Sequence, residues 1–512
     1  MSATDPAEVV RAYHERTKHR LDKYADGPGS LDWDAQPDPF RRWQDTTVVP
    51  LPRNLAAADI PWSALAGERP AQPVTLATLA VLLRHAVALT AWKQYGDSRW
   101  SLRAHPSSGN LHPTETWVCA LGVGGLADGL YHYQARDHSL ELRADHPTDE
   151  AAPGLWLGFS SIAWREAWKY GERAFRYCQL DLGHVLAAVA YAAALNGWSP
   201  RLLPLGHDAL AARLGLDRSG EFAGVEPEEA DVILALAGTA LPPAFTNWHG
   251  RPSLLDPHPM YRWPVIEEVT VASRGPLPDL PLPATTTPAG AANATDIAAA
   301  RVLLKRRSAQ AFDGNSVMPG GVFRRLLTSL LPDGSPAWRL WTAAARVHPV
   351  LFVHRVEGMA PGLYVLPRSD DGLAGLRSAM RPEFAWQPAD AELPLYQLIA
   401  AKAERTARTV SCHQDIASRC AVAFMFVAEF AAPIAENPAA WRHLHWEAGL
   451  LGHCLGLEAE AAGWRGTGIG CFFDDADREI LGLADDRYQV VYHFSVGMAV
   501  DDPRLTTLPA YD

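Results

Sequence analysis

The chain is poor in positive charge and has no dense basic segment. Its 46 Lys and Arg residues are outnumbered by 58 Asp and Glu residues, which gives a formal net charge of −12. Nonspecific binding to nucleic acid depends on Lys and Arg side chains that neutralise phosphates, so we expect no nucleic-acid partner. The first residues also lack the apolar core that is typical of a signal peptide.

Long hydrophobic runs are absent as well. The most apolar stretches cover residues 185–195, 232–241 and 421–435, and each is shorter than the roughly 20 residues that a membrane-spanning helix needs. We therefore expect no membrane partner and a cytoplasmic location. The six cysteines show no paired spacing, so structural disulfides are not expected and reduced thiols are the default.

Several motifs of catalysis and metal binding are missing or incomplete. The sequence contains neither a Walker-type Gly-Lys-Ser/Thr loop nor a Gly-x-Ser-x-Gly elbow. The glycines at 122–125 imitate a dinucleotide-binding fingerprint, but they lie between two predicted strands and no helix follows. His443 and His445 suggest a metal, yet two positions apart on a predicted helix they face different sides. We predict no metal site.

The chain does contain a repeated segment. Residues 177–198 match residues 443–464 at an offset of 266 residues, and shorter upstream matches follow in the same order. The matched pairs include Asp181 with Glu447, Gly183 with Gly449, and the His-Pro pair at 112–113 with that at 348–349. A long-period repeat of this kind predicts two copies of one domain. A chain of 512 residues is long enough for both.

The boundary between the copies is predicted from composition. Residues 272–295 contain five prolines among Ala, Thr and Gly, which cannot pack as helix or sheet and are typical of a linker. The first domain would then cover residues 1–271 and the second 296–512. Residues 1–60, rich in Pro and Trp, read as an irregular arm laid over other surfaces.

Hydrophobic periodicity predicts helices and strands without a regular βαβ rhythm, which favours the α+β class. The expected helices cover 76–95, 175–195, 296–307 and 441–462, and the expected strands cover 116–121, 129–133, 346–353, 362–366 and 490–496.

Arg306, Arg307 and Ser308 end one predicted helix. Two planar, permanently charged guanidinium groups and a hydroxyl are donors suited to a phosphate. The ordinary alternative is a solvated basic helix end that complements the helix dipole.

Two loops could approach a flat, polar ligand. In the first, Pro106, Ser107, Ser108 and Asn110 bring two hydroxyls and an amide around a glycine, although a simple Ser-Gly-Asn turn has the same composition. In the second, Gly468, Ile469 and Gly470 expose backbone N–H groups, although a flexible connector would also be rich in glycine.

Together these motifs resemble the FMN-dependent nitroreductase superfamily: Arg-Arg-Ser-x-x-x-Phe-Asp (306–313), Pro-Ser-Ser-Gly-Asn-Leu-His-Pro (106–113) and Gly-Ile-Gly-x-Phe-Phe-Asp-Asp (468–475). The resemblance covers both halves and is closest to tandem members related to the azoline oxidases, which aromatise thiazoline and oxazoline rings in modified peptides. It implies a nitroreductase-like α+β fold whose two copies form an intramolecular pseudo-dimer. In solution we expect a monomer or a weak homodimer.

The resemblance also implies a division of roles between the copies. Arg306, Arg307 and Ser308 of the second copy would anchor the FMN phosphate, and the loop Pro106–Ser107–Ser108–Asn110 of the first would lie along the flavin ring. A backbone N–H from the segment Gly468–Ile469–Gly470 would lie near flavin N5, and Arg504 is a further candidate for the phosphate.

The mirror-related site lacks these parts. The first copy offers only Arg16 and its neighbours as an anchor, and residues 343–349 of the second contain neither the Ser pair nor the Asn. We therefore predict one FMN per chain.

Three functions follow from the resemblance. The first is NAD(P)H-dependent reduction of a nitroaromatic or quinone-like small molecule. The second is azoline-type dehydrogenation of a modified peptide, with oxygen reoxidising the flavin. The third is a flavin-binding protein that has lost catalysis. Azoline oxidases use a Lys-Tyr pair for proton abstraction, which Lys169-Tyr170 superficially matches. Trp164 and Trp168 would either pack in the core or form a lid over the flavin.

Overall fold

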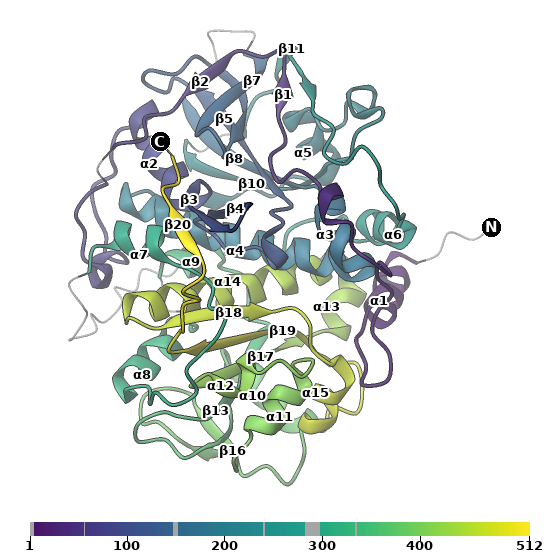
Figure 1. The fold of residues 1–512 in the computed structure, drawn as a ribbon, viewed down its shortest axis with the longest axis vertical. Helices are drawn as coiled ribbons and strands as arrows, with labels where there is room; N and C mark the ends of the chain where they lie inside the picture. Colours follow the sequence, from purple (N-terminus) through teal and green to yellow (C-terminus); the bar gives the residue numbers. More distant parts are fainter. Residues whose placement is uncertain are drawn as a thin grey trace.

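The computed structural model describes residues 5–55, 57–146, 152–238, 241–281, 297–332 and 335–511. These residues form two lobes, the first copy running from purple to teal and the second from green to yellow (Figure 1). Each lobe contains one large antiparallel sheet, and the two longest helices lie between the sheets. The mixture of helices and strands in each lobe confirms the predicted α+β class.

The two large sheets share one strand order. The first copy has the order β11-β7-β6-β5-β8-β10-β9, with β2 beside β7, and the second has β15-β16-β14-β13-β17-β19-β18. The strands of the first are β2 (Val48–Pro50), β5 (Thr114–Leu121), β6 (Gly129–Gln134), β7 (Ser139–Asp145), β8 (Gly154–Ser161), β9 (Arg201–Leu202), β10 (Glu229–Ala237) and β11 (Thr246–Trp248). Those of the second are β13 (Val347–Val353), β14 (Gly362–Val365), β15 (Gln387–Pro388), β16 (Tyr396–Ala400), β17 (Val422–Glu429), β18 (Arg465–Ile469) and β19 (Tyr488–Gly497). The series β6-β5-β8-β10-β9 and β14-β13-β17-β19-β18 therefore correspond strand by strand.

Two long helices, α4 (Ala174–Leu195) and α14 (Ala440–Ala461), form the interface between the copies. They touch backbone to backbone at Gly183 and Gly449. A Cβ atom at Gly183 would lie 2.2 Å from the Trp446 carbonyl oxygen, and one at Gly449 would lie 2.3 Å from that of Leu180. Each contact is the mirror of the other at the offset of 266 residues, so a pseudo-twofold axis passes between the glycines. The duplication read from the sequence is confirmed.

A second contact lies on the same axis. The Trp62 amide donates to the Ile297 carbonyl at 2.9 Å, and the Ala299 amide donates to the Ile60 carbonyl at 2.7 Å. Residues 60–62 therefore correspond to 297–299, an offset of 237, and Arg306 corresponds to Arg69. The prediction that Arg16 replaces the anchor in the first copy is wrong.

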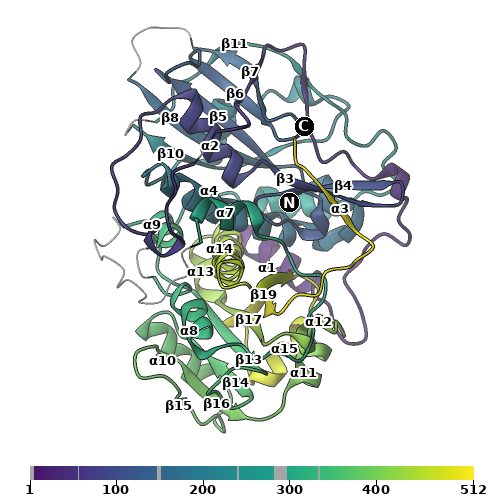
Figure 2. The same ribbon diagram turned by 60° about the vertical axis from the view of Figure 1, so that its left-hand side comes forward.

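The remaining helices cover the sheets and connect the copies. Those that matter for the site are α1 (Pro6–Arg16), α2 (Leu76–Ala86), α3 (Ala163–Tyr170), α6 (Pro264–Ala272), α7 (Ala299–Lys305), α11 (Glu404–Val410) and α15 (Asp474–Leu481). The C-terminal tail crosses to the first copy, where β20 (Thr506–Leu508) pairs with the hairpin of β3 (Leu89–Tyr95) and β4 (Ser98–Arg103). Figure 2 shows this yellow tail lying along the purple hairpin.

Two sequence predictions about the first copy need correction. The helix predicted over 76–95 ends at Ala86, because residues 89–95 form β3, which Gly96 (φ +55°) turns back into β4. The arm over 1–60 is not irregular throughout, since Asp5 caps α1 and Pro6 begins it. Of the predicted linker, Ala272 ends α6, residues 274–281 form no helix or strand, and 282–295 lie outside the described residues.

One stretch, Ala163–Leu195, is long and apolar enough to cross a membrane, although each apolar run in the sequence had read as too short. It comprises α3 and α4, and its most apolar window is wholly buried inside the protein. Such burial is what a core helix shows.

Candidate functional site

The loop at 106–110 is held from below by Asp181 of α4. The Ser107 hydroxyl donates to the carboxylate at 2.6 Å, and Ser108 donates through its amide at 3.0 Å and its hydroxyl at 2.9 Å. Burial raises the pKa of Asp181 to about 7, against the lowering effect of these hydrogen bonds. Asn110 donates to the Ser101 carbonyl at 2.9 Å. The polar side chains of this loop therefore fix its shape.

The end of α3 lies over the same loop. Gly109 has φ +56°, and a Cβ atom there would lie 2.6 Å from Tyr170 Oη and 3.1 Å from Lys169 Nζ. Tyr170 packs edge-on against Tyr177, with ring centroids 4.6 Å apart. Burial lowers the pKa of Lys169. An amine and a phenol thus meet above the predicted ring-binding loop.

The predicted phosphate anchor begins where α7 ends. Arg306 leaves the helix (ψ 128°), is only 6% exposed, and donates from Nε to the Ala104 carbonyl at 2.8 Å. Arg307 donates to the Leu304 carbonyl at 2.9 Å, and Ser308 is exposed. Burial lowers the pKa of Arg306 to about 9 and lowers that of Arg307 as well. Neither guanidinium forms an ion pair with a carboxylate in the part of the chain that the structure describes.

The glycine-rich segment is packed tightly on one side. A Cβ atom at Gly468 would lie 1.7 Å from Tyr492 Oη, and one at Gly470 would lie 2.2 Å from the Tyr177 ring. The Gly470 carbonyl accepts hydrogen bonds from Arg173 Nη2 at 3.1 Å and from Tyr177 Oη at 3.2 Å. Only backbone groups of this segment therefore remain for a ligand.

One face of α4 unites the three segments. Tyr177 binds the glycine-rich segment, Asp181 binds the loop, and His184 lies close enough to Arg306 for that charge to lower its pKa. Positions 177, 181 and 184 are four and three residues apart and share one side of a helix. The structure therefore brings together the parts that the sequence predicted, from both copies, along a single helix that the motifs themselves did not single out.

Arg504 is not part of this arrangement. Its side chain is 69% exposed, forms an ion pair with Asp502 at 2.7 Å and lies over the Tyr95 ring. The charges that act on Arg307 are instead Glu460, Arg465 and Arg84. The predicted role of Arg504 at the phosphate is not supported by its position, because the tail carries it past the anchor to the far end of β3.

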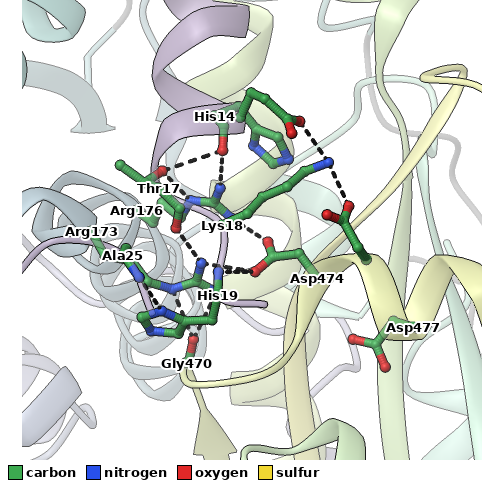
Figure 3. A network of polar contacts seen from close by, with 12 residues as sticks. His14, Thr17, Lys18, His19, Ala25, Arg173, Arg176, Gly470, Asp474 and Asp477 are labelled. Carbon is green, nitrogen blue, oxygen red and sulfur yellow. Dashed lines mark hydrogen bonds and ion pairs between the residues drawn. The ribbon is translucent and has the colours of Figure 1, made fainter. Parts of the chain in front are cut away.

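A buried charge network braces the glycine-rich segment (Figure 3). Asp474 of α15 accepts hydrogen bonds from Arg173 Nη1 at 3.0 Å, Arg176 Nη1 at 2.8 Å and the His19 amide at 2.9 Å. The network joins the N-terminal arm and α4 of the first copy to α15 of the second. Arg16 stands outside it and pairs with Glu172 through two hydrogen bonds of 2.6 Å.

The mirror-related region has a different lining. Pro278 and Pro281, at the start of the predicted linker, line a cavity of about 820 Å³ together with Ala343, Ala344 and Glu447. Glu447 corresponds to Asp181, but it accepts from the Arg346 amide and from Arg368 and holds no serine. Ser107 and Ser108 thus have no counterparts here, as the sequence predicted.

Comparison with known proteins identifies the fold. A family model described as Nitroreductase family matches residues 303–498, within the second copy. A solved structure described as a nitroreductase from Anabaena variabilis ATCC 29413 aligns with 96% of this chain and 99% of its own, with a TM-score of 0.69 and 23% identity. That similarity extends over both copies and establishes the fold.

Two curated relatives match shorter segments. The trifolitoxin-processing protein TfxB of Rhizobium leguminosarum bv. trifolii is 30% identical over 142 residues, which is 24% of this chain and 38% of TfxB. A protein of Methanocaldococcus jannaschii named as a nitroreductase is 30% identical over 125 residues, which is 22% of this chain and 60% of that protein. The chain therefore spans less than two thirds of either relative.

The fold and the matched residues define an oxidoreductase of nitroreductase type. The chain belongs to the nitroreductase family as a tandem member whose two copies form an intramolecular pseudo-dimer. The recognition made from three motifs and a duplication is confirmed.

Proposed function

We propose that the chain is an FMN-dependent dehydrogenase that oxidises an azoline ring in a modified peptide, with one FMN held between the two copies. The observation that carries this proposal is the position of Lys169 and Tyr170, whose polar atoms both lie over Gly109 of the loop. An amine and a phenol at that place are suited to removing a proton from a substrate carbon.

The residues present fit FMN. Arg306 and Arg307 are buried or half-buried cations without an ion-pair partner among the described residues, and a phosphate would supply the missing negative charge. Ser308, exposed beside them, adds a hydroxyl donor. When bound, FMN supplies a two-electron acceptor for the hydride that leaves the substrate.

The two side chains above the loop have different roles. Burial lowers the pKa of Lys169, which increases the fraction of neutral amine that can accept a proton at Nζ. Burial and the neighbouring Glu166 raise the pKa of Tyr170, so its phenol keeps its proton and can donate a hydrogen bond from Oη. Lys169 is therefore the base, and Tyr170 orients the ring or the amine.

The first copy's α4 keeps these groups in register. Asp181 fixes the loop beneath the substrate, and Arg173 and Tyr177 fix the Gly470 carbonyl of the opposite copy. Trp168, one residue before Lys169, packs edge-on against Trp33 of the arm at 5.4 Å. The arm therefore closes the site on the side of α3, which favours exclusion of water from the base.

The curated relative TfxB supports a tailored peptide as the substrate class, since it is named for the processing of trifolitoxin. The similarity covers part of each protein, so the ring type and the peptide are not specified by it. We propose further that the protein acts in the cytoplasm and does so as a single chain, because the usual dimer interface is satisfied internally.

Anaerobic reduction of the bound flavin tests the proposal. The purified wild-type protein should lose its flavin absorbance on addition of a peptide that carries a thiazoline or oxazoline. Lys169→Met should keep the flavin and lose the colour about 100-fold to 10,000-fold more slowly, the range expected for a general base. Lys402→Met, which changes an exposed lysine, is the control. Unchanged bleaching in Lys169→Met would contradict the assigned base.

The second candidate is NAD(P)H-dependent reduction of a nitroaromatic or quinone-like small molecule. The name of the Methanocaldococcus jannaschii relative favours it. In the same assay, rapid bleaching by NADPH or NADH without bleaching by the azoline peptide would select this reductase. A purified protein without flavin absorbance would select a chain that has lost catalysis.

A further inference from the structure

Two of the six cysteines differ from the others in their exposure. Cys119, Cys178, Cys420 and Cys454 are buried, whereas Cys412 and Cys471 are partly exposed. Cys471 directly follows Gly470, and Cys412 lies two residues after the end of α11. Neither residue has a role in the proposed dehydrogenation.

Backbone contacts place the two cysteines side by side. The Phe473 amide donates to the Val410 carbonyl at 2.7 Å, so residues 410–412 run next to 471–473. The Gln414 amide bridges the two stretches, donating to the Ser411 carbonyl at 2.8 Å and to the Cys471 carbonyl at 3.0 Å. The Cys412 and Cys471 side chains hydrogen-bond to each other.

The surroundings of Cys471 carry surplus positive charge. Arg173 and Arg176 share the single carboxylate of Asp474 in the buried network of Figure 3. His19 accepts the Ala25 amide at Nδ1 (2.9 Å), which leaves its Nε2 proton for Cys471. Electropositive, partly exposed surroundings of this kind are typical of reactive thiolates.

The two thiols are held in different states. The hydrogen bond from Cys412, and that from His19, lower the pKa of Cys471 to about 5 against the effect of burial, so it is a thiolate at neutral pH. The same hydrogen bond raises the pKa of Cys412, which keeps its proton. Cys412 and His413 both have left-handed backbone (φ +53° and +60°), a conformation that is costly for residues other than glycine.

We propose that Cys412 and Cys471 form a reversible redox dithiol that reacts with hydroperoxides. The Cys471 thiolate attacks one oxygen of the peroxide, breaks the O–O bond and becomes a sulfenic acid as the other oxygen leaves as water or alcohol. Cys412 then attacks that sulfur and expels water, which leaves a disulfide between the two residues. Two thiols are oxidised by two electrons and one peroxide is reduced.

The disulfide would tie the end of α11 to the segment directly after Gly470, within the second copy. Oxygen that reoxidises a flavin yields hydrogen peroxide, so an oxidant of this class would arise beside the dithiol if the proposed dehydrogenation occurs. The dithiol itself does not depend on that source, because its thiols and their neighbours all belong to the chain.

Intact-mass and peptide mapping of the full-length protein test the proposal. The reduced wild-type protein is treated with stoichiometric hydrogen peroxide, alkylated and digested without reductant. We expect a loss of two hydrogen masses, one cross-linked peptide that joins Cys412 to Cys471, and reversal by dithiothreitol. The four buried cysteines, alkylated only after unfolding, serve as internal controls.

Two variants separate the steps. Cys412→Ser should stop at a Cys471 sulfenic acid that dimedone traps, and Cys471→Ser should leave Cys412 unoxidised under the same conditions. Wild-type protein that forms no Cys412–Cys471 cross-link, or Cys471 that reacts no faster than Cys412 does in Cys471→Ser, would overturn the proposal. A cross-link that forms in protein without flavin would support the dithiol while the proposed function fails.

Discussion

The Ser107 hydroxyl donates a hydrogen bond of 2.6 Å to the buried carboxylate of Asp181, 74 residues further along the chain. This contact couples the predicted ring-binding loop to the helix that runs between the two copies. The same helix holds Gly470 of the second copy through Tyr177. The shape of the site therefore depends on α4 as much as on the motifs.

Asp181 should make stability depend on pH. Burial raises its pKa from 3.8 to about 7, so the folded state binds a proton more tightly than the unfolded chain. The contribution is fully present below about pH 4 and is lost as the pH rises through about 7. A shift of this size corresponds to about 4 kcal/mol.

Urea unfolding of wild type and Asp181→Asn between pH 4 and pH 8 checks this expectation. The other titrating groups are common to both proteins, so the difference between their unfolding free energies isolates Asp181. That difference should move against the wild type as the pH rises. A difference that is constant with pH would show that Asp181 does not titrate in this window.

The crossing of α4 and α14 should not tolerate a methyl group. Gly183→Ala places a Cβ atom 2.2 Å from the Trp446 carbonyl oxygen, so the helices must separate, and we expect a loss of about 3 kcal/mol or more of unfolding free energy. Gly321→Ala is the matched control, because it also lies in a helix and its Cβ would meet nothing within 4 Å. Thermal unfolding should show a large decrease for the first variant and none for the second.

Asp474 should matter far more than its neighbour Asp475. Asp474→Asn leaves Arg173 and Arg176 buried without their shared carboxylate, and breaking a buried pair typically costs about 3–5 kcal/mol. Asp475, whose side chain is 38% exposed, pairs with Lys18 and Arg20 at the surface, so Asp475→Asn should cost less than about 1 kcal/mol. Equal losses in chemical denaturation would contradict this assignment of the network.

Much of the fold follows from local sequence, because the two copies were matched on residues that the interface itself requires. Gly183 and Gly449 are glycines since each faces a backbone, and a repeat of such positions is visible without a structure. The strands and long helices likewise follow from continuous apolar runs. The helix predicted over 76–95 failed at residue 87, where pairing with β4 and the distant β20 overrides the helical spacing of the apolar residues.

The site was predictable in its parts and not in its supports. Arg306, Ser107 and Gly470 stood out as motifs, but nothing local connects Tyr177 or Arg173 with Gly470, nearly 300 residues away. Arg504 was placed wrongly because the path of the tail across the first copy is a long-range property. Arg16 was mistaken for the mirror anchor because the true counterpart, Arg69, keeps only one residue of the motif.

The anchor should be specific to one copy. Arg306→Ala should abolish flavin retention, since it removes a buried cation for which the structure shows no other negative partner among the described residues. Arg16→Ala should retain flavin, because Arg16 is committed to Glu172. The ratio of flavin to protein absorbance after gel filtration measures both. Retention in Arg306→Ala would refute its assignment as the anchor.

The central claim is that two copies of one domain share a single flavin site. Quantitative release of flavin from purified protein, with the protein concentration from amino-acid analysis, tests it most directly. The account predicts one FMN per 512-residue chain. Two FMN per chain would contradict it, because the mirror-related region would then hold a cofactor without the serine pair or the anchor.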